Sequence, residues 1–397
     1  MGEVINWMGG WPKDGLLSAE EWEEMRREQA QAARAAVQER AAAPGGMLPE
    51  LRERIAAGWL GSKATAPGAS ASIWAAAGAD AALQLAFKRL LRPGDIVLTE
   101  RPANRMALQA IRRAGAVPVG VRGDSGGMDP DAVAEAIEEL KPKMVYAAPA
   151  CTDPEGRVWS GERVAALAER CAEGGVKLLL DERQAALAEQ PEMRPAGAGG
   201  EREAPGGAAG ADIEEAAEEG ATVLVLRELP PGLIGGLRFA WLFGSGLTDA
   251  EERSLAQAYA LPGEAESVSA ADQLALLAYA EQPVEPALAT LRFVYRTRQT
   301  LLAEALGRHG WSEALPAEAP AGVHTWLALP LGLDAEALLR ASWLKGVLFQ
   351  PGAAFYASKP DPFKLRLTAV HSDEKEIKEG VRRIGEAIGE FMGRSSV

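Results

Sequence analysis

Between residues 70 and 182 the sequence repeats one pattern, in which a short apolar run is followed by an amphipathic helical segment. The apolar runs are SIWAAAG, DIVLTE, VPVGV, MVYAAP and VKLLLDE, and segments such as ADAALQLAFKRLL and NRMALQAIRRAG separate them. Uninterrupted apolar strands joined by crossover helices are typical of a parallel sheet that is buried on both faces. The pattern therefore predicts a large α/β domain with a mostly parallel central sheet.

The rest of the chain predicts one irregular segment and a second domain. Residues 190–211 are rich in Gly, Ala and Pro, and such a composition predicts a mobile surface loop because it buries little apolar area. Two strand-like runs, TVLVLREL and LRFAWLFG, then return the chain to the sheet, and strands and helices after about residue 320 indicate a smaller α+β domain. The expected limits are 1–45 for an N-terminal arm and part of the small domain, 46–290 for the large domain, and 291–397 for the small domain.

Composition restricts the possible partners and locations. The 42 basic and 56 acidic residues give a net charge of −14, which repels nucleic-acid backbones and anionic membrane surfaces, so neither is an expected partner. Two cysteines are too few for a disulfide framework, and three histidines without ligand spacing argue against a metal site. The sequence has no signal-peptide pattern and no apolar membrane span, and a cytoplasmic protein is expected.

Several motifs occur in the order that is typical of one enzyme family. They are GGMLPELRERIA, AAAGADAAL, LLRPGDIVLTERP, TDPEG, LLLDE, GLRFAW and KLRLTAV, and together they extend over nearly the whole chain. In these motifs the chain resembles the class I/II aminotransferases of the fold type I pyridoxal phosphate (PLP) superfamily, most of all the aminotransferase-like domain of GntR-linked bacterial regulators. The resemblance implies the three-layer fold of that superfamily, PLP as the family cofactor, and a homodimer.

The resemblance also locates the lysine that binds PLP covalently in the family. That lysine stands seven residues before the phosphate-binding arginine, in the arrangement Ser-Lys-x-x-x-Pro-Gly-Leu-Arg. Seven residues before Arg238 the chain has Pro231, and no lysine occurs from residue 178 to residue 344. We therefore expect no catalytic residue at this position and no covalently bound PLP.

The phosphate-binding turn of the family is also changed. Gly78 and Ala79 match the family's Gly-Ala, but Asp80 replaces the phosphate-binding glutamine that follows. A helix N-terminus attracts anions, and a carboxylate placed there opposes a phosphate group. Phosphate binding is therefore expected to be weak.

Three positions that surround the cofactor ring in the family differ as well. Asn104 stands where a tyrosine stacks on the ring, and Asp153 stands where an asparagine binds the ring hydroxyl. The tyrosine that follows the pyridinium-binding aspartate corresponds to Arg183 or Gln184, depending on register. With Pro231 and Asp80, five cofactor contacts are changed together.

Three family positions are retained. By resemblance Asp181 pairs with the pyridinium nitrogen, Arg238 binds the phosphate, and Arg366 binds the substrate α-carboxylate, for which an arginine fork is well suited. Each residue also has a structural interpretation. Asp181 could cap a loop or pair with Arg183, Arg238 could pair with Asp80 or Asp181, and Arg366 could be a solvated strand residue.

The expected function is therefore a degenerate aminotransferase-like protein that keeps the fold and the pocket for ligand-binding, regulatory or structural use. A small carboxylate or phosphate is the expected ligand. The alternative is an active PLP-dependent aminotransferase that acts on an amino acid and a 2-oxo acid. A DNA-binding regulator is a third hypothesis, but the sequence leaves no room for a basic winged-helix module before the aminotransferase-like domain, so regulation would act through a partner.

Overall fold

The computed structural model describes most of the chain. The described residues are 4–9, 12, 14–32, 46–61, 72–188, 221–260, 267–311, 315, 321–330 and 332–394. The predicted mobile loop at 190–211 lies outside them, so that expectation stays a prediction.

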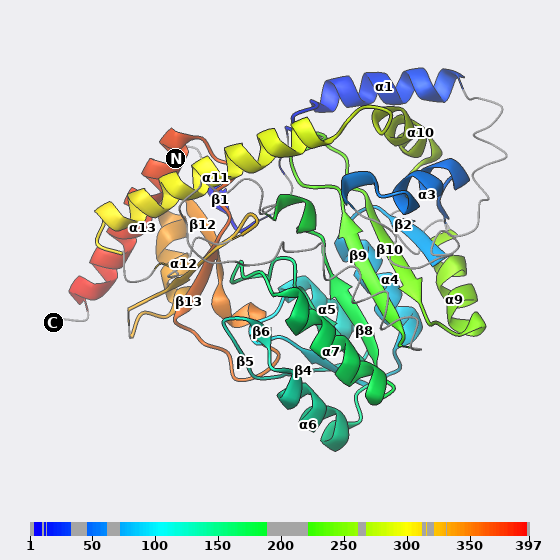
Figure 1. Cartoon of the computed structure of the whole chain (residues 1–397). Coiled ribbons are helices and arrows are strands. Elements are labelled where there is room, and N and C mark those ends of the chain that lie inside the picture. Colours follow the sequence, from blue (N-terminus) through cyan, green and yellow to red (C-terminus); the bar gives the residue numbers. More distant parts are fainter. Residues whose placement is uncertain are drawn as a thin grey trace.

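A seven-stranded sheet forms the centre of the larger part of the molecule (Figure 1). Its strand order is β2-β10-β9-β8-β7-β3-β4, and β10 is antiparallel to both of its neighbours while the pairs from β9 to β4 are parallel. The strands are β2 (Ile73–Ala76), β3 (Ile96–Thr99), β4 (Val117–Gly120), β7 (Met144–Ala147), β8 (Lys177–Asp181), β9 (Val223–Glu228) and β10 (Ala240–Ser245). The predicted mostly parallel sheet is confirmed.

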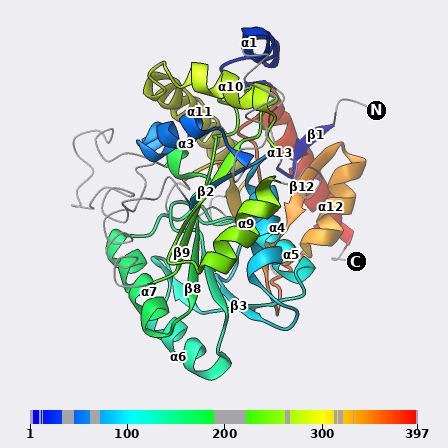
Figure 2. The ribbon, with the colours of Figure 1, turned by 90° about the vertical axis from the view of Figure 1, so that its right-hand side faces the viewer.

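Side chains alternate between the two faces of this sheet and build two cores. Leu224 and Leu226 of β9 face the core under α4, α5 and α9, whereas Val223 and Val225 face the core under α6 and α7. Figure 2 shows these two helix layers on opposite sides of the strands. The helices are α4 (Ala79–Leu90), α5 (Arg105–Arg113), α6 (Pro130–Leu140), α7 (Gly161–Glu173) and α9 (Asp249–Ala260). Burial on both faces explains why the strands read as continuous apolar runs.

A four-stranded sheet of order β1-β12-β13-β11 forms the smaller part. Its strands are β1 (Ile5–Trp7), β11 (Thr325–Ala328), β12 (Val347–Pro351) and β13 (Lys364–Leu367), and it packs with α12 (Ala335–Leu344) and α13 (Glu374–Arg394). β1 lies parallel to β12, so residues near the N-terminus complete a sheet that is otherwise built from the last fifth of the chain. The predicted smaller α+β unit is confirmed.

The remaining helices lie around the large sheet and connect the two parts. They are α1 (Ala19–Ala32), α3 (Pro49–Ala56), α10 (Ala270–Tyr279) and α11 (Glu285–Arg308). In Figure 1 the long helix α11 runs from the neighbourhood of α10 to that of α13. The expected domain boundary at 290 falls inside α11, and the three domain limits stay a prediction.

Candidate functional site

The residues singled out by the sequence gather at the carboxyl edge of the large sheet, facing the small sheet. Asp181 ends β8, Gly78 and Ala79 follow β2 at the start of α4, and Arg238 precedes β10. Arg366 reaches the same region from β13. The carboxyl ends of strands in an open α/β sheet are where such folds bind ligands.

Asp181 is surrounded by the chain's own donors. It is 3% exposed, and it accepts hydrogen bonds from the Tyr146 hydroxyl at 2.7 Å and from the Arg183 guanidinium at 2.8–3.0 Å. The backbone N–H of Arg183 also donates to it, at 3.2 Å. Burial raises the pKa of Tyr146 well above its usual value, and the adjacent Asp181 carboxylate adds to this effect, so the phenol stays a donor. The interpretation in which Asp181 pairs with Arg183 matches this geometry.

Arg183 extends this pair to the start of α4. Its Nη1 lies 2.8 Å from Oδ1 of Asp80, and Nη2 of Arg238 lies 3.5 Å from Oδ2 of the same carboxylate. Burial alone would raise the pKa of Asp80, but the two guanidinium groups outweigh it and hold that pKa below its usual value. Asp181, Arg183, Asp80 and Arg238 thus form one line of alternating charges, which we call the edge cluster.

A carboxylate also occupies the N-terminus of α4. The backbone N–H of Ala79 donates to Oε1 of Glu228 at 2.8 Å. Glu228 is buried at the end of β9, and burial raises its pKa to about 7, although Arg183 and the Ala79 N–H act in the opposite direction. A phosphate at a helix N-terminus accepts from such backbone N–H groups, but here the N–H of Ala79 is already bonded to Glu228.

The glycine before this helix turn is required by its surroundings. Gly78 has φ = 103°, and a Cβ on it would lie 2.9 Å from Nε and Nη2 of Arg238. A side chain at this position would be strained and would displace the guanidinium group. The Gly-Ala pair that the sequence singled out therefore places the arginine against the start of α4.

Arg366 forms the second charged group of the site. Its Nη1 lies 2.6 Å from Oδ1 and 2.8 Å from Oδ2 of Asp153, its Nη2 donates to the Met8 carbonyl at 3.1 Å, and its guanidinium stacks over the Phe355 ring at 4.9 Å. Arg366 is 4% exposed. The interpretation of Arg366 as a solvated strand residue is therefore wrong, because a partner 213 positions away in the sequence buries it.

Asn104 completes this second group. It caps α5 by accepting from the backbone N–H groups of Met106 and Ala107, and its Nδ2 donates to Oδ2 of Asp153 at 2.9 Å. Burial alone would raise the pKa of Asp153, but the Arg366 guanidinium outweighs it and holds that pKa below its usual value. We call Arg366, Asp153 and Asn104 the arginine clamp.

Pro231 lies in the turn between β9 and β10. The Tyr295 hydroxyl of α11 donates to its carbonyl, and a Cβ on the next residue, Gly232, would lie 2.3 Å from the same hydroxyl oxygen. Gly232 has φ = 86°, a conformation that favours glycine. Contacts of the backbone, at the Pro231 carbonyl and at Gly232, thus fix this turn. The proline ring offers no amine that could bind a cofactor covalently.

Three further residues lie near the site, and of these the resemblance placed only Cys151 close to the pocket. His324 lies 3.4 Å from Nη1 of Arg366 and bonds the Thr368 hydroxyl through Nδ1, and burial, with Arg366 nearby, lowers its pKa to about 3. Cys151 donates to the Ala321 carbonyl at 3.3 Å, and burial raises the pKa of its thiol far above the usual value, so it is no activated nucleophile. Glu228 is the third. The sequence feature that could have indicated it is its acidic side chain at the end of an otherwise apolar strand.

Neither a metal site nor a membrane span occurs in the part of the chain that the structure describes. These residues contain no group of three or more His, Cys, Asp or Glu side chains arranged to hold a metal ion. Among the described helices, none is long and apolar enough to cross a membrane.

The chain is similar to known aminotransferases in sequence and in structure. The model of the aminotransferase class I and II family matches residues 3–208. A 2-aminoadipate transaminase of Thermus thermophilus is 28% identical over 78% of this chain and 74% of the relative. The crystal structure of LysN, an α-aminoadipate aminotransferase of Thermus thermophilus in complex with N-(5'-phosphopyridoxyl)-L-leucine, matches with a TM-score of 0.78 at 26% identity, over 98% of this chain and 93% of that one.

A transcriptional regulator is also among the relatives. The vitamin B6 salvage pathway transcriptional repressor of Salmonella typhimurium is 29% identical over 75% of this chain and 62% of the repressor. This relative supports the likeness to bacterial regulators that the motifs indicated, at a lower coverage than the transaminase.

Proposed function

The chain belongs to the class I and II aminotransferase family, and from that premise we propose that it is a degenerate member that does not transaminate through a lysine. Its role is that of a cytoplasmic ligand-binding, regulatory or structural subunit. Fold alone does not decide activity, so the proposal depends on the residues of the site.

The observation that carries the proposal is that the chain's own side chains occupy the binding groups of the site. Arg183 pairs with Asp181, where the family resemblance places the pyridinium nitrogen of PLP. Asp153 pairs with Arg366 in the manner of a substrate carboxylate. Each cation and each anion that would contact the cofactor or the substrate is thus neutralised within the protein.

The phosphate end of the site supports the same conclusion. Glu228 accepts the N–H of Ala79 at the start of α4, and Asp80 stands beside Arg238. A phosphate dianion placed there would meet two carboxylates and would have to displace one of them from a hydrogen bond. The residues present therefore do not fit PLP.

The position of the missing lysine adds an independent argument. Pro231 has no amine, and no lysine occurs from residue 178 to residue 344. The covalent link on which transamination depends in the family cannot form in this turn.

The alternative is an active PLP-dependent aminotransferase, and the relatives favour it. The Thermus thermophilus relative is a 2-aminoadipate transaminase, and the LysN structure contains a phosphopyridoxyl amino acid. An active enzyme would need the edge cluster and the arginine clamp to open, as well as an amine from outside this turn.

Borohydride reduction in the presence of added PLP, followed by peptide mapping, separates the two candidates. We expect the native protein to show no absorption band of bound PLP and to yield no pyridoxyl group on one defined lysine. The comparison protein is the triple variant Pro231→Lys, Asp80→Gln, Asn104→Tyr, in which the three new side chains would contact one PLP molecule and are expected to act together. A pyridoxyl group on one specific lysine of the native protein would establish the active alternative.

We also propose a homodimer, with no direct contact to nucleic acid or membrane, and the aminotransferase family to which the chain belongs supports it. The small carboxylate or phosphate ligand that the sequence led us to expect would have to displace Asp80 or Asp153 from the arginines that they pair with. Sedimentation at micromolar concentration tests the assembly, and a stable monomer would rule the dimer out.

A further inference from the structure

The C-terminal ends of α4 and α5 form a surface far from the candidate site. Figure 2 shows the two helices side by side on one face of the large sheet, where they share a core. Both begin at the carboxyl edge of the sheet, beside the site, and end at the opposite edge, where β3 and β4 begin. Four exposed basic residues, which we call the basic patch, lie at these ends: Lys88, Arg92, Arg112 and Arg113.

Hydrogen bonds between the two helix ends hold the basic patch together. Nη1 of Arg113 donates to Oε1 of Gln84 at 3.2 Å. Gln84 lies one turn before Lys88, on the same face of α4. The turn after α4 is joined to the turn after α5, because the N–H of Gly94 donates to the Gly115 carbonyl at 2.9 Å. The four cations therefore belong to one surface.

The part of the chain that the structure describes supplies no carboxylate partner for the basic patch. Nη2 of Arg112 donates to the backbone carbonyls of Tyr356 and Ala357, at 3.3 and 3.1 Å. The carboxylate of Asp95 accepts the backbone N–H of Arg92 at 2.7 Å and forms no ion pair with its guanidinium. On a chain with a net charge of −14, the patch is thus a local surface of the opposite sign.

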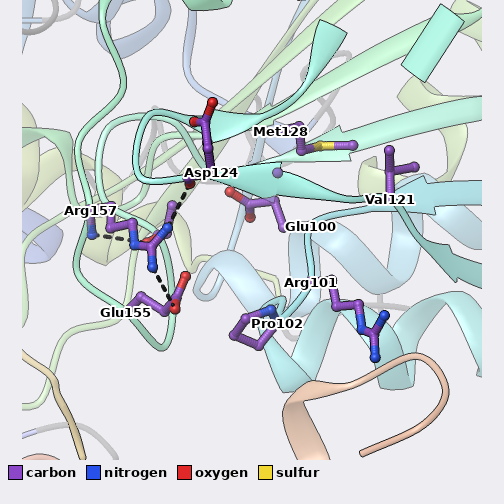
Figure 3. Close-up of a pocket in the computed structure, with 11 residues that line it drawn as sticks. Glu100, Arg101, Pro102, Val121, Asp124, Met128, Glu155 and Arg157 are labelled. Carbon is purple, nitrogen blue, oxygen red and sulfur yellow. Dashed lines mark hydrogen bonds and ion pairs between the residues drawn. The ribbon is translucent and has the colours of Figure 1, made fainter. Parts of the chain in front are cut away.

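An arginine elsewhere on the surface shows that exposure does not prevent pairing. Beside the hairpin of β5 (Gly123–Asp124) and β6 (Gly127–Met128) lies a cavity whose lining includes Arg157 (Figure 3). The Arg157 side chain is 39% exposed, and it still donates to Oε1 of Glu155 at 3.0 Å and to the Asp124 carbonyl at 2.6 Å. The cations of the basic patch have no such carboxylate.

The helix dipole does not account for this concentration of cations. Basic residues are favoured near the C-terminus of any helix. Yet α6, α9, α10 and α12 have no basic residue in the last turn, whereas α4 and α5 have two each. Arg92 lies outside both helices. The excess is therefore a property of the surface where α4 and α5 meet.

We propose that the basic patch binds an acidic segment of a partner protein, with an apolar side chain of that segment against Val117. Val117 begins β4 and is 48% exposed. Its N–H donates to the Asp95 carbonyl at 2.8 Å, which places it beside the turn that contains Arg92. An apolar contact with a charged rim is the usual composition of a protein interface. This surface goes beyond the proposed function, because it lies at the opposite edge of the sheet from the site.

Two features favour an acidic peptide over other partners. β4 is the last strand of the sheet, but Pro118 has no N–H for a partner strand, so recognition depends on side chains. A nucleic acid would extend beyond the patch into the field of a chain that is acidic overall, whereas a short peptide stays within about one Debye length, about 8 Å, of the cations.

Fluorescence anisotropy of a labelled peptide, titrated with the full chain, tests the proposal. The probe is Glu-Glu-Leu-Glu-Glu-Leu-Glu-Glu, and we expect saturable binding that weakens as the salt concentration rises. The same peptide with serine in place of both leucines should bind at least about threefold more weakly, because it has no apolar side chain to bury. Absence of binding, or equal binding of single-stranded DNA of the same charge, would overturn the proposal.

Variants assign the binding to the patch. Lys88→Glu with Arg92→Glu should weaken it at least about tenfold, because like charges then face each other. The matched control is Arg340→Glu with Lys375→Glu, which reverses two exposed cations on α12 and α13 and changes the net charge equally. Equal losses in both double variants would show that binding follows net charge and would overturn the proposal.

A third variant leaves every charge in place and decides the matter if the double variant does not fold. Val117→Ser should weaken binding of the leucine peptide at least about threefold and leave binding of the serine peptide unchanged. Native affinity of Val117→Ser for both peptides would contradict the apolar contact that the proposal requires.

Discussion

Asp181 and Glu100 lie at the same edge of the large sheet and are buried to a similar degree, with exposed fractions of 3% and 6%. Asp181 receives Tyr146 and three donors of Arg183, whereas no side-chain donor of the described residues bonds Glu100 and the backbone N–H of Ala148 is its neighbour instead. Burial is therefore not what separates the two carboxyl groups. The difference lies in the cation, which Arg183 supplies beside Asp181, whereas no described residue forms an ion pair with Glu100.

The largest expected effect comes from removing the cation of the edge cluster. Arg183→Met leaves both Asp181 and Asp80 without their main partner in a poorly solvated site, and loss of one partner of a buried pair typically destabilises by about 3–5 kcal/mol. Urea denaturation measures this loss. Arg382→Met, which breaks exposed pairs on α13, is the control and should lose far less stability, because solvent screens those pairs. Equal losses in both variants would contradict the buried cluster.

The second effect concerns the carboxylate that binds the start of α4. The folded-state pKa of Glu228 is about 7, above its ordinary value of 4.5, so its contribution to stability is fully present below pH 4.5 and is lost as the pH rises to about 7. The loss is at most about 3 kcal/mol. Glu228→Gln keeps an acceptor for the Ala79 N–H and removes the titration.

Urea denaturation at pH 4.5 and pH 8 measures this effect. Between these values we expect the native protein to lose more stability than the Glu228→Gln variant does. Asp80 and Asp153 have lowered pKa values and titrate below this window, so they do not mask the difference. Parallel pH profiles of the two proteins would refute the assignment.

The smallest effect is a direct comparison of the two carboxyl groups. Asp181→Asn should destabilise by about 3 kcal/mol, because it removes the anion that Arg183 and Tyr146 bind. Glu100→Gln should change stability by less than about 1 kcal/mol, since no ion pair is lost and the amide oxygen can still accept from the Ala148 N–H. The two free energies of unfolding, measured in the same buffer, check the contrast, and an equally large loss for Glu100→Gln would contradict it.

Much of the fold could be predicted from the sequence because its strands are buried on both faces. Continuous apolar runs such as MVYAAP and VKLLLDE leave little ambiguity once helices separate them. β1 was harder to predict, because a three-residue strand is too short to show a hydrophobic period and its partner β12 lies more than 330 residues away in the sequence. The two-residue strands β5 and β6 are too short to be predicted for the same reason.

The candidate site could be predicted only where contacts are local or follow a motif. Asp181 and Arg183 are two residues apart, and their pairing was one of the stated interpretations. The bond between Asp153 and Arg366 joins two domains across 213 positions, and no local pattern indicates it. Glu228 and Ala79 are likewise 149 positions apart, so the strand containing Glu228 offered no reason to place its carboxylate at a helix start.

The shared partners of Asp80 also bear on how such a protein evolves. Arg183 and Arg238 both contact this one carboxylate, and Arg183 contacts Asp181 as well. A single change toward the family residue, Arg183→Tyr or Asp80→Gln, would break more than one ion pair before any cofactor could replace the lost contacts. Under the proposed function, a stepwise change toward the family's chemistry would therefore pass through less stable intermediates, because the paired side chains depend on one another.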